Sequence, residues 1–293
     1  MSAGNRCFMT LVSNDDFVTG ARALARSIKA VRSAYPLLVL STYDAPSVRS
    51  LEQWGAQIVL VDPLPLSEGF QQRHSRQQVH SRNPFTKGNK PAFHSPLDNF
   101  AKLWLFSFEA FQKIVFLDAD TMLVQNCDRL FDYPAFSAAP NVYESLIDFQ
   151  RMNSGVFVAQ PQRSVFDDML NKLDAPDAYW PRTDQTFLQH YFPNWHGLPY
   201  LYNCLQYVYF QLPELWDWSA IKLLHFQYEK PWQSQHPKSK QLAPLIKLWQ
   251  VMYDEGLLLD EGAHKESESR KQPCSPKVNI PKKGRSSSSW RTA

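Results

Sequence analysis

The stretch Lys113–Phe131 reads KIVFLDADTMLVQNCDRLF. Its apolar residues Ile114–Leu117 are typical of a buried strand, and two carboxylates, Asp118 and Asp120, follow directly. Ligands of open α/β sheets bind at the carboxyl ends of parallel strands, so this pair stands where a binding site is expected. Two carboxylates this close repel each other unless a cation lies between them or one is protonated. Hard oxygen ligands of this kind suit Mn²⁺ or Mg²⁺.

An Asp-x-Asp pair alone leaves other interpretations open. Aspartates are common as turn or cap residues after strands. A calcium-binding EF-hand loop is a poor fit, because its sixth position counted from Asp118 is Leu123 instead of glycine. A haloacid-dehalogenase-like phosphatase, with Asp118 as nucleophile, is a stronger alternative. In those enzymes a threonine usually stands two residues after the second aspartate, where this chain has Met122.

The segments around this stretch predict an α/β fold with a mostly parallel central sheet flanked by helices. Short apolar runs alternate with segments of helical periodicity, which is the order expected of parallel strands joined by helices. Strands are predicted at Arg6–Val12, Leu37–Ser41, Gln57–Asp62, Lys113–Leu117, Gly155–Gln160 and Ile221–Phe226. Helices are predicted at Phe17–Ser33, Ala45–Trp54, Pro96–Phe111, Gln162–Leu173, Asp184–Phe192 and Gln241–Tyr253.

Composition bounds the class of protein. The chain has 293 residues, 44% of them hydrophobic, so it can bury a sizeable core. It contains no apolar run near the roughly 18 residues of a transmembrane helix, and its first residues do not read as a secretory signal. Four widely spaced cysteines form no metal or disulfide framework. We therefore expect a reduced, cytoplasmic protein without a membrane span.

Charge divides the chain into two parts. Residues 264–293 hold eight Lys/Arg against two Glu, a balance of +6, which leaves −3 for residues 1–263 out of the total of +3. We expect one catalytic domain over residues 1–262 and a disordered basic tail over 263–293. Because the globular part is mildly acidic, nucleic-acid binding is not expected. Within the domain, residues 71–95 hold five Lys/Arg and no acid, and predict either a lid or a solvated loop insertion.

Polar residues follow other predicted strands or open a predicted helix. Ser13–Phe17 leaves the first strand, Met152–Val156 precedes a later one, Thr183–Gln185 opens a helix, and His225–Trp232 ends the last strand. These stretches resemble glycosyltransferase family 8, the glycogenin-like and galactinol-synthase-like retaining sugar transferases. The similar segments are MTLVSNDDF, FAKLWLFSFEAFQKIVFLDADTMLVQNCDRLF, MNSGVFVAQP, TDQTFL, LPYLYN and HFQYEKPW, in the family's order over about residues 6–232.

The resemblance implies a GT-A nucleotide-sugar fold, a UDP-sugar donor and Mn²⁺, with Mg²⁺ as the other candidate. It implies Asp118, Asp120 and His225 as metal ligands. It also implies contacts to the nucleotide from Leu11, Ser13, Asn14, Phe17 and Ala119, and to the diphosphate or sugar from Lys102 and Lys230. Asn153, Ser154, Asp184 and Gln185 are implied around the donor sugar, with Asp184, Gln185 and Lys230 as the catalytic residues.

The chemistry of sugar transfer asks for the same kind of site. A departing nucleoside diphosphate gains negative charge that must be neutralised, and the chain has no Gly-rich phosphate loop. A metal on Asp118, Asp120 and His225, with Lys230 nearby, would supply the positive charge. The acceptor, a small-molecule, glycan or protein hydroxyl, is left open, as are homodimer formation and a catalytically silent nucleotide-sugar-binding role.

Three departures from the family pattern stand out. Tyr228 and Glu229 fill a spacing where glycogenin-like relatives carry a glycine, and Pro181 stands where glycogenin has a further aspartate. Tyr207 and Tyr209 lie near the place of the tyrosine that glycogenin glycosylates on itself. Buried aromatic packing is the simpler account of both tyrosines.

Overall fold

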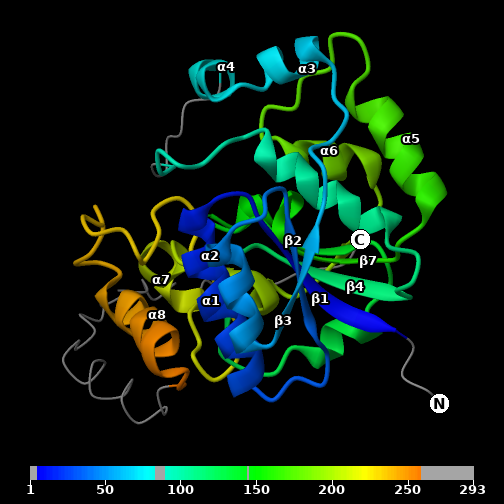
Figure 1. Ribbon diagram of the computed structural model, residues 1–293. Coiled ribbons are helices and arrows are strands. Elements are labelled where there is room, and N and C mark those ends of the chain that lie inside the picture. The colour runs from blue at the N-terminus through cyan, green and yellow to red at the C-terminus, as the bar shows by residue number, and fades with distance from the viewer. Residues whose placement is uncertain (1–4, 83–89, 144, 259–293) are drawn as a thin grey trace, which may run out of the picture. The chain divides into compact units, whose positions relative to one another are not determined.

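Seven strands form the central sheet of the computed structural model, which describes residues 5–82, 90–143 and 145–258 (Figure 1). Their order is β3-β2-β1-β4-β7-β6-β8. β3, β2, β1 and β4 run parallel, β7 is antiparallel to β4 and β6, and β8 is parallel to β6. The strands are β1 (Arg6–Val12), β2 (Leu37–Ser41), β3 (Ala56–Leu60), β4 (Lys113–Leu117), β6 (Ser137–Pro140), β7 (Met152–Ala159) and β8 (His196–Gly197). The predicted mostly parallel sheet is confirmed.

Each face of the sheet is covered because alternate side chains of a strand point to opposite faces. In β1, Phe8 and Val12 join one core, which includes residues of helix α1 (Asp15–Ala30). Cys7 and Met9 join the core on the other face, with residues of the 3₁₀ helix η2 (Asp98–Ser107). Helices α5 (Arg163–Leu173) and α6 (Asp184–Tyr191) also contribute to that second core.

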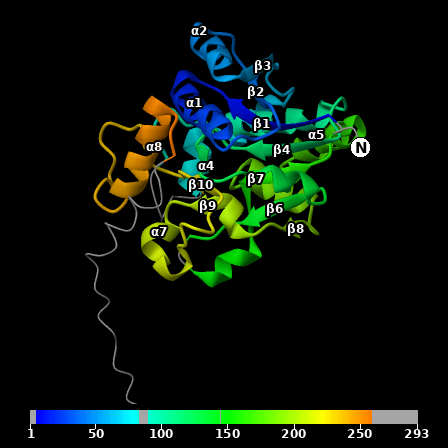
Figure 2. The same cartoon turned by 90° about the horizontal axis from the view of Figure 1, so that it is seen from below.

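A second, three-stranded sheet lies beside the first, in the order β5-β10-β9 (Figure 2). Its strands are β5 (Thr121–Leu123), β9 (Cys204–Leu205) and β10 (Leu223–His225). A third core joins β5, β9 and β10 to helices α7 (Val208–Gln211) and α8 (Ala243–Glu255). These strands are two or three residues long, too short to show a periodicity, so the sequence predicts only β10.

Three predicted elements differ from the structure. The segment Pro96–Phe111 contains a 3₁₀ helix, η2, instead of an α-helix. The predicted loop over residues 71–95 contains the end of α3 (Glu68–Arg73) and all of α4 (Arg76–Arg82). Each of these two helices buries only one apolar residue, Phe70 or Val79, which leaves too little periodicity for a sequence-based prediction. The short helix α2 (Pro46–Arg49) continues as a 3₁₀ turn to Trp54.

The described residues belong to one compact unit, Met1–Leu259. The predicted basic tail, residues 263–293, and residues 83–89 of the basic segment lie outside the described part of the chain. Within the described part no helix is long and apolar enough to cross a membrane. Cys7, Cys127 and Cys204 are buried and free.

Candidate active site

The carboxylate pair sits in a tight turn between the two sheets. Strand β4 ends at Leu117, and the Asp118 N–H donates to the carbonyl of Gly155 on β7 at 2.8 Å. The Thr121 hydroxyl then donates to the Asp118 carbonyl at 2.7 Å, which closes the turn. Helix α1 supports it from outside, because Gly20 lies so close to the Ala119 carbonyl that a Cβ atom there would overlap it. The turn is therefore held at both ends and on one side.

Strand pairing in the second sheet brings the third predicted ligand to this turn. β5 follows the turn and pairs with β10, where His225 stands opposite Thr121. The Phe226 N–H also donates to the Asp120 carbonyl at 2.9 Å. As a result His225 Nε2 lies 3.1 Å from Asp120 Oδ1 and 3.9 Å from Asp118 Oδ2. One ligand atom from each of the three side chains lies within 4.8 Å of the others, so the three can share one ion.

A chain of amides fixes which imidazole nitrogen of His225 carries a proton. The Gly155 N–H donates to Asn153 Oδ1 at 2.8 Å, which identifies that atom as the oxygen. Asn203 Nδ2 then donates to the same oxygen at 2.8 Å, so Asn203 Oδ1 is left facing His225 Nδ1, also at 2.8 Å. Because an amide oxygen only accepts, Nδ1–H is the donor. In the neutral imidazole, Nε2 therefore presents its lone pair to the carboxylates.

This arrangement calls for a cation. A neutral Nε2 and an ionised Asp120 Oδ1 at 3.1 Å would face each other with lone pairs, so either a proton or a metal ion must lie between them. A histidine whose second nitrogen is held by an acceptor is the usual form of a metal-ligating histidine. Two carboxylates and one such imidazole fit a divalent first-row metal. The donor set thus fits the metal that the sequence predicts.

Lys230 contributes a second positive charge next to Asp120. Its buried ammonium donates to Asp120 Oδ2 and, at 2.9 Å, to the Phe226 carbonyl. Burial alone would raise the pKa of Asp120, but the charge and hydrogen bond of Lys230 oppose that rise and favour a lower pKa. Asp120 is therefore ionised and available as a ligand at neutral pH.

Lys102 joins the carboxylate pair to the predicted sugar-binding residues. Its ammonium, in a side chain 3% exposed, lies 3.0 Å from Asp118 Oδ1 and 2.8 Å from Asp184 Oδ2. Burial opposes its charge, yet the two carboxylates raise the pKa of Lys102 above its usual value. Asp184 Oδ2 also accepts from the Ser154 hydroxyl at 2.6 Å, and Oδ1 accepts from the Thr183 hydroxyl at 2.8 Å. Asp184 is thereby fixed in one orientation.

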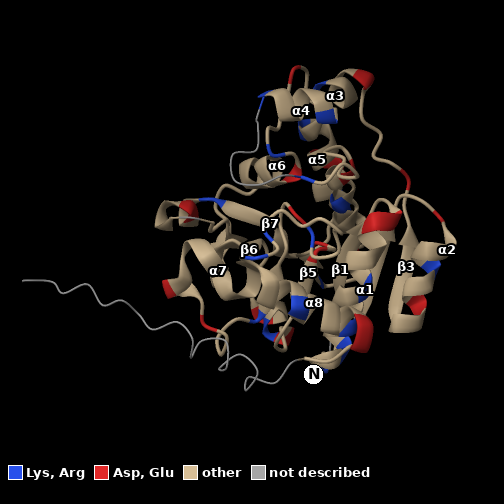
Figure 3. Ribbon diagram, turned by 90° about the vertical axis from the view of Figure 1, so that its left-hand side faces the viewer, with Lys and Arg blue, Asp and Glu red and all other residues tan. Residues whose placement is uncertain are grey.

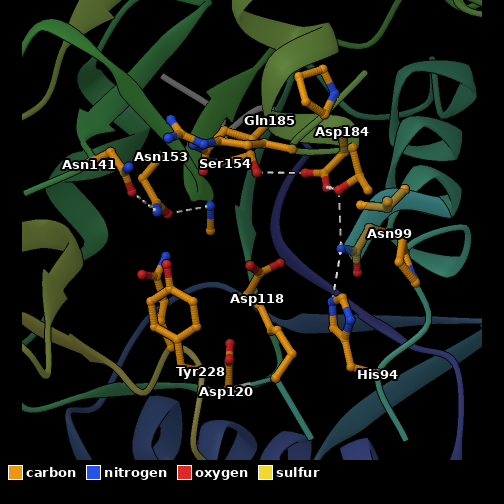
Figure 4. Close-up of a pocket in the computed structure, with 18 of the residues that line it drawn as sticks. His94, Asn99, Asp118, Asp120, Asn141, Asn153, Ser154, Asp184, Gln185 and Tyr228 are labelled. Atoms are coloured by element: carbon orange, nitrogen blue, oxygen red, sulfur yellow. Dashed lines mark hydrogen bonds between the residues drawn. The ribbon is translucent and has the colours of Figure 1, made fainter. Parts of the chain in front are cut away.

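A cavity of about 400 Å³ opens over these groups, and Figure 4 shows Asp118 at its centre, with Asn153 on one side and Asp184 on the other. The predicted residues that line it are Lys102, Asp118, Asp120, Asn153, Ser154, Asp184, Gln185 and His225. The structure therefore brings together all the predicted metal ligands and all the residues predicted around the donor sugar.

The residues predicted at the nucleotide lie on a smaller adjoining cavity of about 60 Å³. Leu11, Ser13, Phe17, Ala119 and Lys230 line it together with Lys102, Asp118 and Asp120. Asn14 is the exception and lines neither of the two cavities. Its side chain caps helix α1 by accepting from the Phe17 N–H at 3.3 Å, and it donates to the Phe93 carbonyl at 3.0 Å.

Lys90 is a functional candidate that the sequence analysis missed. It lines both cavities, and no acidic partner contacts its ammonium among the described residues. Burial, followed by the charge of Lys230, lowers the pKa of Lys90 to about 8, although Asp120 and Asp118 oppose the shift. Lys90 is the last Lys/Arg of the basic segment 71–95, which was predicted as a lid or loop, and the charge of that segment was the available signal. The position of a single lysine within that segment could not be predicted.

The sequence analysis also missed three asparagines that hydrogen-bond to predicted site residues or their neighbours. Asn203 orients His225, Asn141 accepts from Asn153 Nδ2 at 2.8 Å, and Asn99 donates to the Thr183 hydroxyl at 3.4 Å. Asn203 ends the quoted segment LPYLYN, but a lone asparagine there carries no signal of its role. Asn203 lies in η5 (Tyr200–Asn203), Asn141 directly after β6 and Asn99 in η2, and these segments meet only in the folded chain.

The two tyrosines considered for self-glycosylation are both packed. Tyr207 is 1% exposed, and its hydroxyl donates to Glu229 Oε2 at 2.8 Å. The Tyr209 ring lies edge to face with Trp216 at 5.0 Å between centroids. Neither tyrosine lines the larger or the smaller cavity.

Replacing Gly155 by alanine should displace the imidazole. A Cβ atom at Gly155 would overlap Cε1 and Nδ1 of His225, so the ring must rotate away from Asn203. We expect Mn²⁺ affinity in the presence of UDP to fall about 10- to 100-fold, as for other losses of ligand orientation. Overpacking should also cost about 1–3 kcal/mol of unfolding free energy. Calorimetric titration and urea unfolding measure the two effects.

Gly197→Ala on β8 is the matched control. A Cβ atom there would meet only Trp195 Cζ3, at 3.9 Å, which is ordinary contact. We expect Mn²⁺ affinity within about twofold of the parent. Equal metal affinity in Gly155→Ala and Gly197→Ala would show that the imidazole is not a ligand.

Comparison with known proteins places this chain in a family. The sequence profile described as "Glycosyl transferase family 8" matches residues 8–236. Galactinol synthase 1 of Solanum lycopersicum is 25% identical over 286 residues, covering 85% of this chain and 81% of that protein. Glycogenin-1 of Homo sapiens is 32% identical over 248 residues, covering 80% of this chain and 65% of that protein.

Solved structures share the fold. The glycosyltransferase GlyE of Streptococcus pneumoniae TIGR4 superimposes with a TM-score of 0.59 at 15% identity, over 94% of this chain and 67% of that chain. The galactosyltransferase LgtC, solved with donor and acceptor sugar analogues, gives a TM-score of 0.55 at 13% identity, over 88% of this chain and 99% of that chain. The GT-A fold expected from the sequence is confirmed.

Proposed function

Because the chain belongs to glycosyl transferase family 8, whose members are retaining glycosyltransferases, we propose that it moves a hexose from a UDP-sugar to a hydroxyl acceptor with Mn²⁺ bound at Asp118, Asp120 and His225. The observation that carries the proposal is the meeting of these three side chains, with the lone pair of His225 Nε2 directed at the carboxylates. Mg²⁺ is the alternative metal, since the donor set suits either hard cation.

The bound metal would act as a Lewis acid that neutralises charge on the departing diphosphate. Two lysines of the chain would help to neutralise the charge on the same diphosphate. Lys90 faces both cavities, and Lys230 lines the smaller one beside Asp120. Preorganised positive charge in a partly closed site stabilises charge that develops in the transition state. Leu11, Ser13 and Phe17 would contact the nucleoside where it borders the smaller cavity.

Asp184 and Gln185 would position the donor sugar. Donors already occupy both Asp184 oxygens, from Ser154, Lys102 and Thr183, which lowers the nucleophilicity of the carboxylate and fixes its direction. We therefore favour a positioning role over a covalent one, with acceptor attack and nucleotide departure on one face of the sugar. Asn153 and Ser154 line the same part of the cavity.

Asp184→Asn tests this role. Asparagine keeps the size of the side chain but weakens its ion pair with Lys102, so the sugar is held less well in the transition state. We expect transfer to fall about 10²- to 10³-fold while UDP affinity stays within about threefold. Transfer is followed by UDP release and affinity by calorimetry. An equal loss of both would mean that Asp184 only supports the fold.

The phosphatase alternative is not favoured by these findings. The family that the chain matches transfers sugars. A panel of UDP-sugars, assayed for UDP release with and without Mn²⁺ and hydroxyl acceptors such as myo-inositol, tests the proposed function as a whole. We expect metal-dependent UDP release with at least one donor. Metal-dependent UDP binding without any release would indicate a catalytically silent binding protein.

We also propose a cellular location and domain bounds for the protein. Three buried, unpaired cysteines support a reducing, cytoplasmic environment. The catalytic domain would span residues 1–262, with residues 263–293 as a basic tail. We leave homodimer formation to a measurement of mass in solution by light scattering.

A further inference from the structure

We propose that the acceptor is an anionic carbohydrate, a sugar or cyclitol that carries a carboxylate or a phosphate. This inference rests on the proposed transferase function and specifies its second substrate. The observation behind it is a pair of arginines, Arg82 and Arg182, that line the larger cavity with exposed side chains. Arg82 ends helix α4, whose only charged residues are basic (Figure 3), and Arg182 precedes helix α6.

Neither arginine is neutralised within the described part of the chain. The Arg82 guanidinium lies over the Tyr179 ring at 4.9 Å, and no described acid pairs with it or with Arg182. Arg182 also lines an adjoining hollow of about 430 Å³ that contains no acidic residue among its described lining. A third arginine shared by both spaces, Arg151, already pairs with the buried Asp148 at 2.5 Å.

The acids of the cavity cannot balance these charges, because each is already engaged. Lys102 lies between Asp118 and Asp184, while Lys230 and His225 hold Asp120. Two exposed guanidinium groups on the cavity lining therefore remain without an acidic partner among the described residues. A planar guanidinium binds a carboxylate or a phosphate through two parallel N–H···O bonds, so an anion is the group these residues fit.

The difference in exposure between the donor-sugar residues and the two arginines favours an anion on the acceptor over one on the donor. Lys102 and Asp184 are 2% and 3% exposed and lie at the buried end, where the donor sugar would sit. Arg82 and Arg182, in contrast, are exposed lining residues, which a second substrate can reach from solvent.

Two aromatic rings at the same cavity suit the carbohydrate part of such an acceptor. Tyr143 and Tyr228 both line it, with ring centroids 5.7 Å apart. Tyr228 adopts a φ of 60°, a left-handed conformation that costs a non-glycine residue about 1 kcal/mol. Glycine would avoid that cost, so the ring itself accounts for a tyrosine here. Lys90 Nζ lies over the Tyr228 ring at 5.5 Å from its centroid, so the apolar contact offered to a sugar ring comes from the parts of Tyr143 and Tyr228 that line the cavity.

Calorimetric titration of three matched ligands into protein saturated with UDP and Mn²⁺ tests the proposal. Glucose, glucuronate and glucose 6-phosphate share one ring and differ in charge, and UDP occupies the nucleotide part of the donor site throughout. We expect one or both anions to bind at least about tenfold more tightly than glucose, and the two anion arms distinguish carboxylate from phosphate. Glucose binding as well as both anions, or no binding of either anion, would overturn the proposal.

Arg182→Gln and Lys247→Gln locate the effect. Lys247 is an exposed cation on α8 that lines none of these cavities. We expect Arg182→Gln to abolish the preference for the anion and Lys247→Gln to keep it. A preference that survives Arg182→Gln would contradict the assignment. If UDP does not bind in the presence of Mn²⁺, the proposed transferase function is wrong. If UDP binds but the anions are not preferred, only the proposal of an anionic acceptor is wrong.

Discussion

Replacing Asp118 by asparagine is expected to lower kcat/KM about 10³-fold or more. The substitution removes one of two carboxylate ligands but keeps the size of the side chain. Lewis-acid stabilisation by a metal is worth several kcal/mol in the transition state, and about 4 kcal/mol corresponds to a factor of 10³. Steady-state assays with the active UDP-sugar measure the rate, and titration of Mn²⁺ in the presence of UDP measures the parallel loss of metal affinity.

Asp118 is a better test than Asp120 because its removal disturbs the fold less. The Asp118 side chain is 31% exposed, and its partner Lys102 keeps Asp184. Asp120 is 8% exposed, and its removal would leave the buried ammonium of Lys230 without a carboxylate. The exposed Asp62 gives a matched control, since Asp62→Asn should leave both activity and metal affinity unchanged. Full activity of Asp118→Asn would exclude a metal at this site.

Replacing Lys102 by methionine should destabilise the protein by about 3–5 kcal/mol and abolish transfer. Methionine fills a similar volume but leaves Asp118 and Asp184 facing each other without the ammonium that now lies 3.0 and 2.8 Å from them. Removing one member of a buried ionic cluster leaves uncompensated charge, which accounts for the size of the effect. Urea unfolding of metal-free protein at pH 7 measures it.

Lys113→Met is the control for this prediction. The Lys113 ammonium is also partly buried, but it donates to two backbone carbonyls, those of Phe131 at 2.9 Å and Tyr133 at 2.6 Å, and to no carboxylate. Its loss should cost only about 1–2 kcal/mol and leave transfer intact. A Lys102→Met variant no less stable than Lys113→Met would show that the carboxylates do not depend on Lys102.

Much of the fold was predictable because its main elements have clear periods. β1, β2 and β4 begin and end where their apolar runs do, and α1 carries a clear amphipathic pattern after the capping residue Asn14. The metal cluster was predictable as well, since Asp118 and Asp120 end a buried strand. His225 was harder to assign, because a lone histidine on an apolar strand is more often structural; its place at a strand end made it a possible ligand, and the family resemblance implied it as the third one.

What the sequence could not provide is the contact between distant segments. The amides of Asn153 and Asn203 meet only when β7 packs against η5, and no local pattern predicts that meeting. The antiparallel direction of β7 also escaped prediction, because a fully buried strand reads the same in either direction. The roles of Lys90 and Arg182 could not be predicted either, since they depend on which cavity each residue faces in the folded chain.

The most direct test of the central claim is anomalous scattering at the manganese absorption edge from crystals grown with Mn²⁺ and UDP. We predict a single strong peak within about 2.5 Å of a carboxylate oxygen of Asp118, a carboxylate oxygen of Asp120 and Nε2 of His225. A peak elsewhere, or a metal on the aspartates with the His225 ring turned away, would contradict the account.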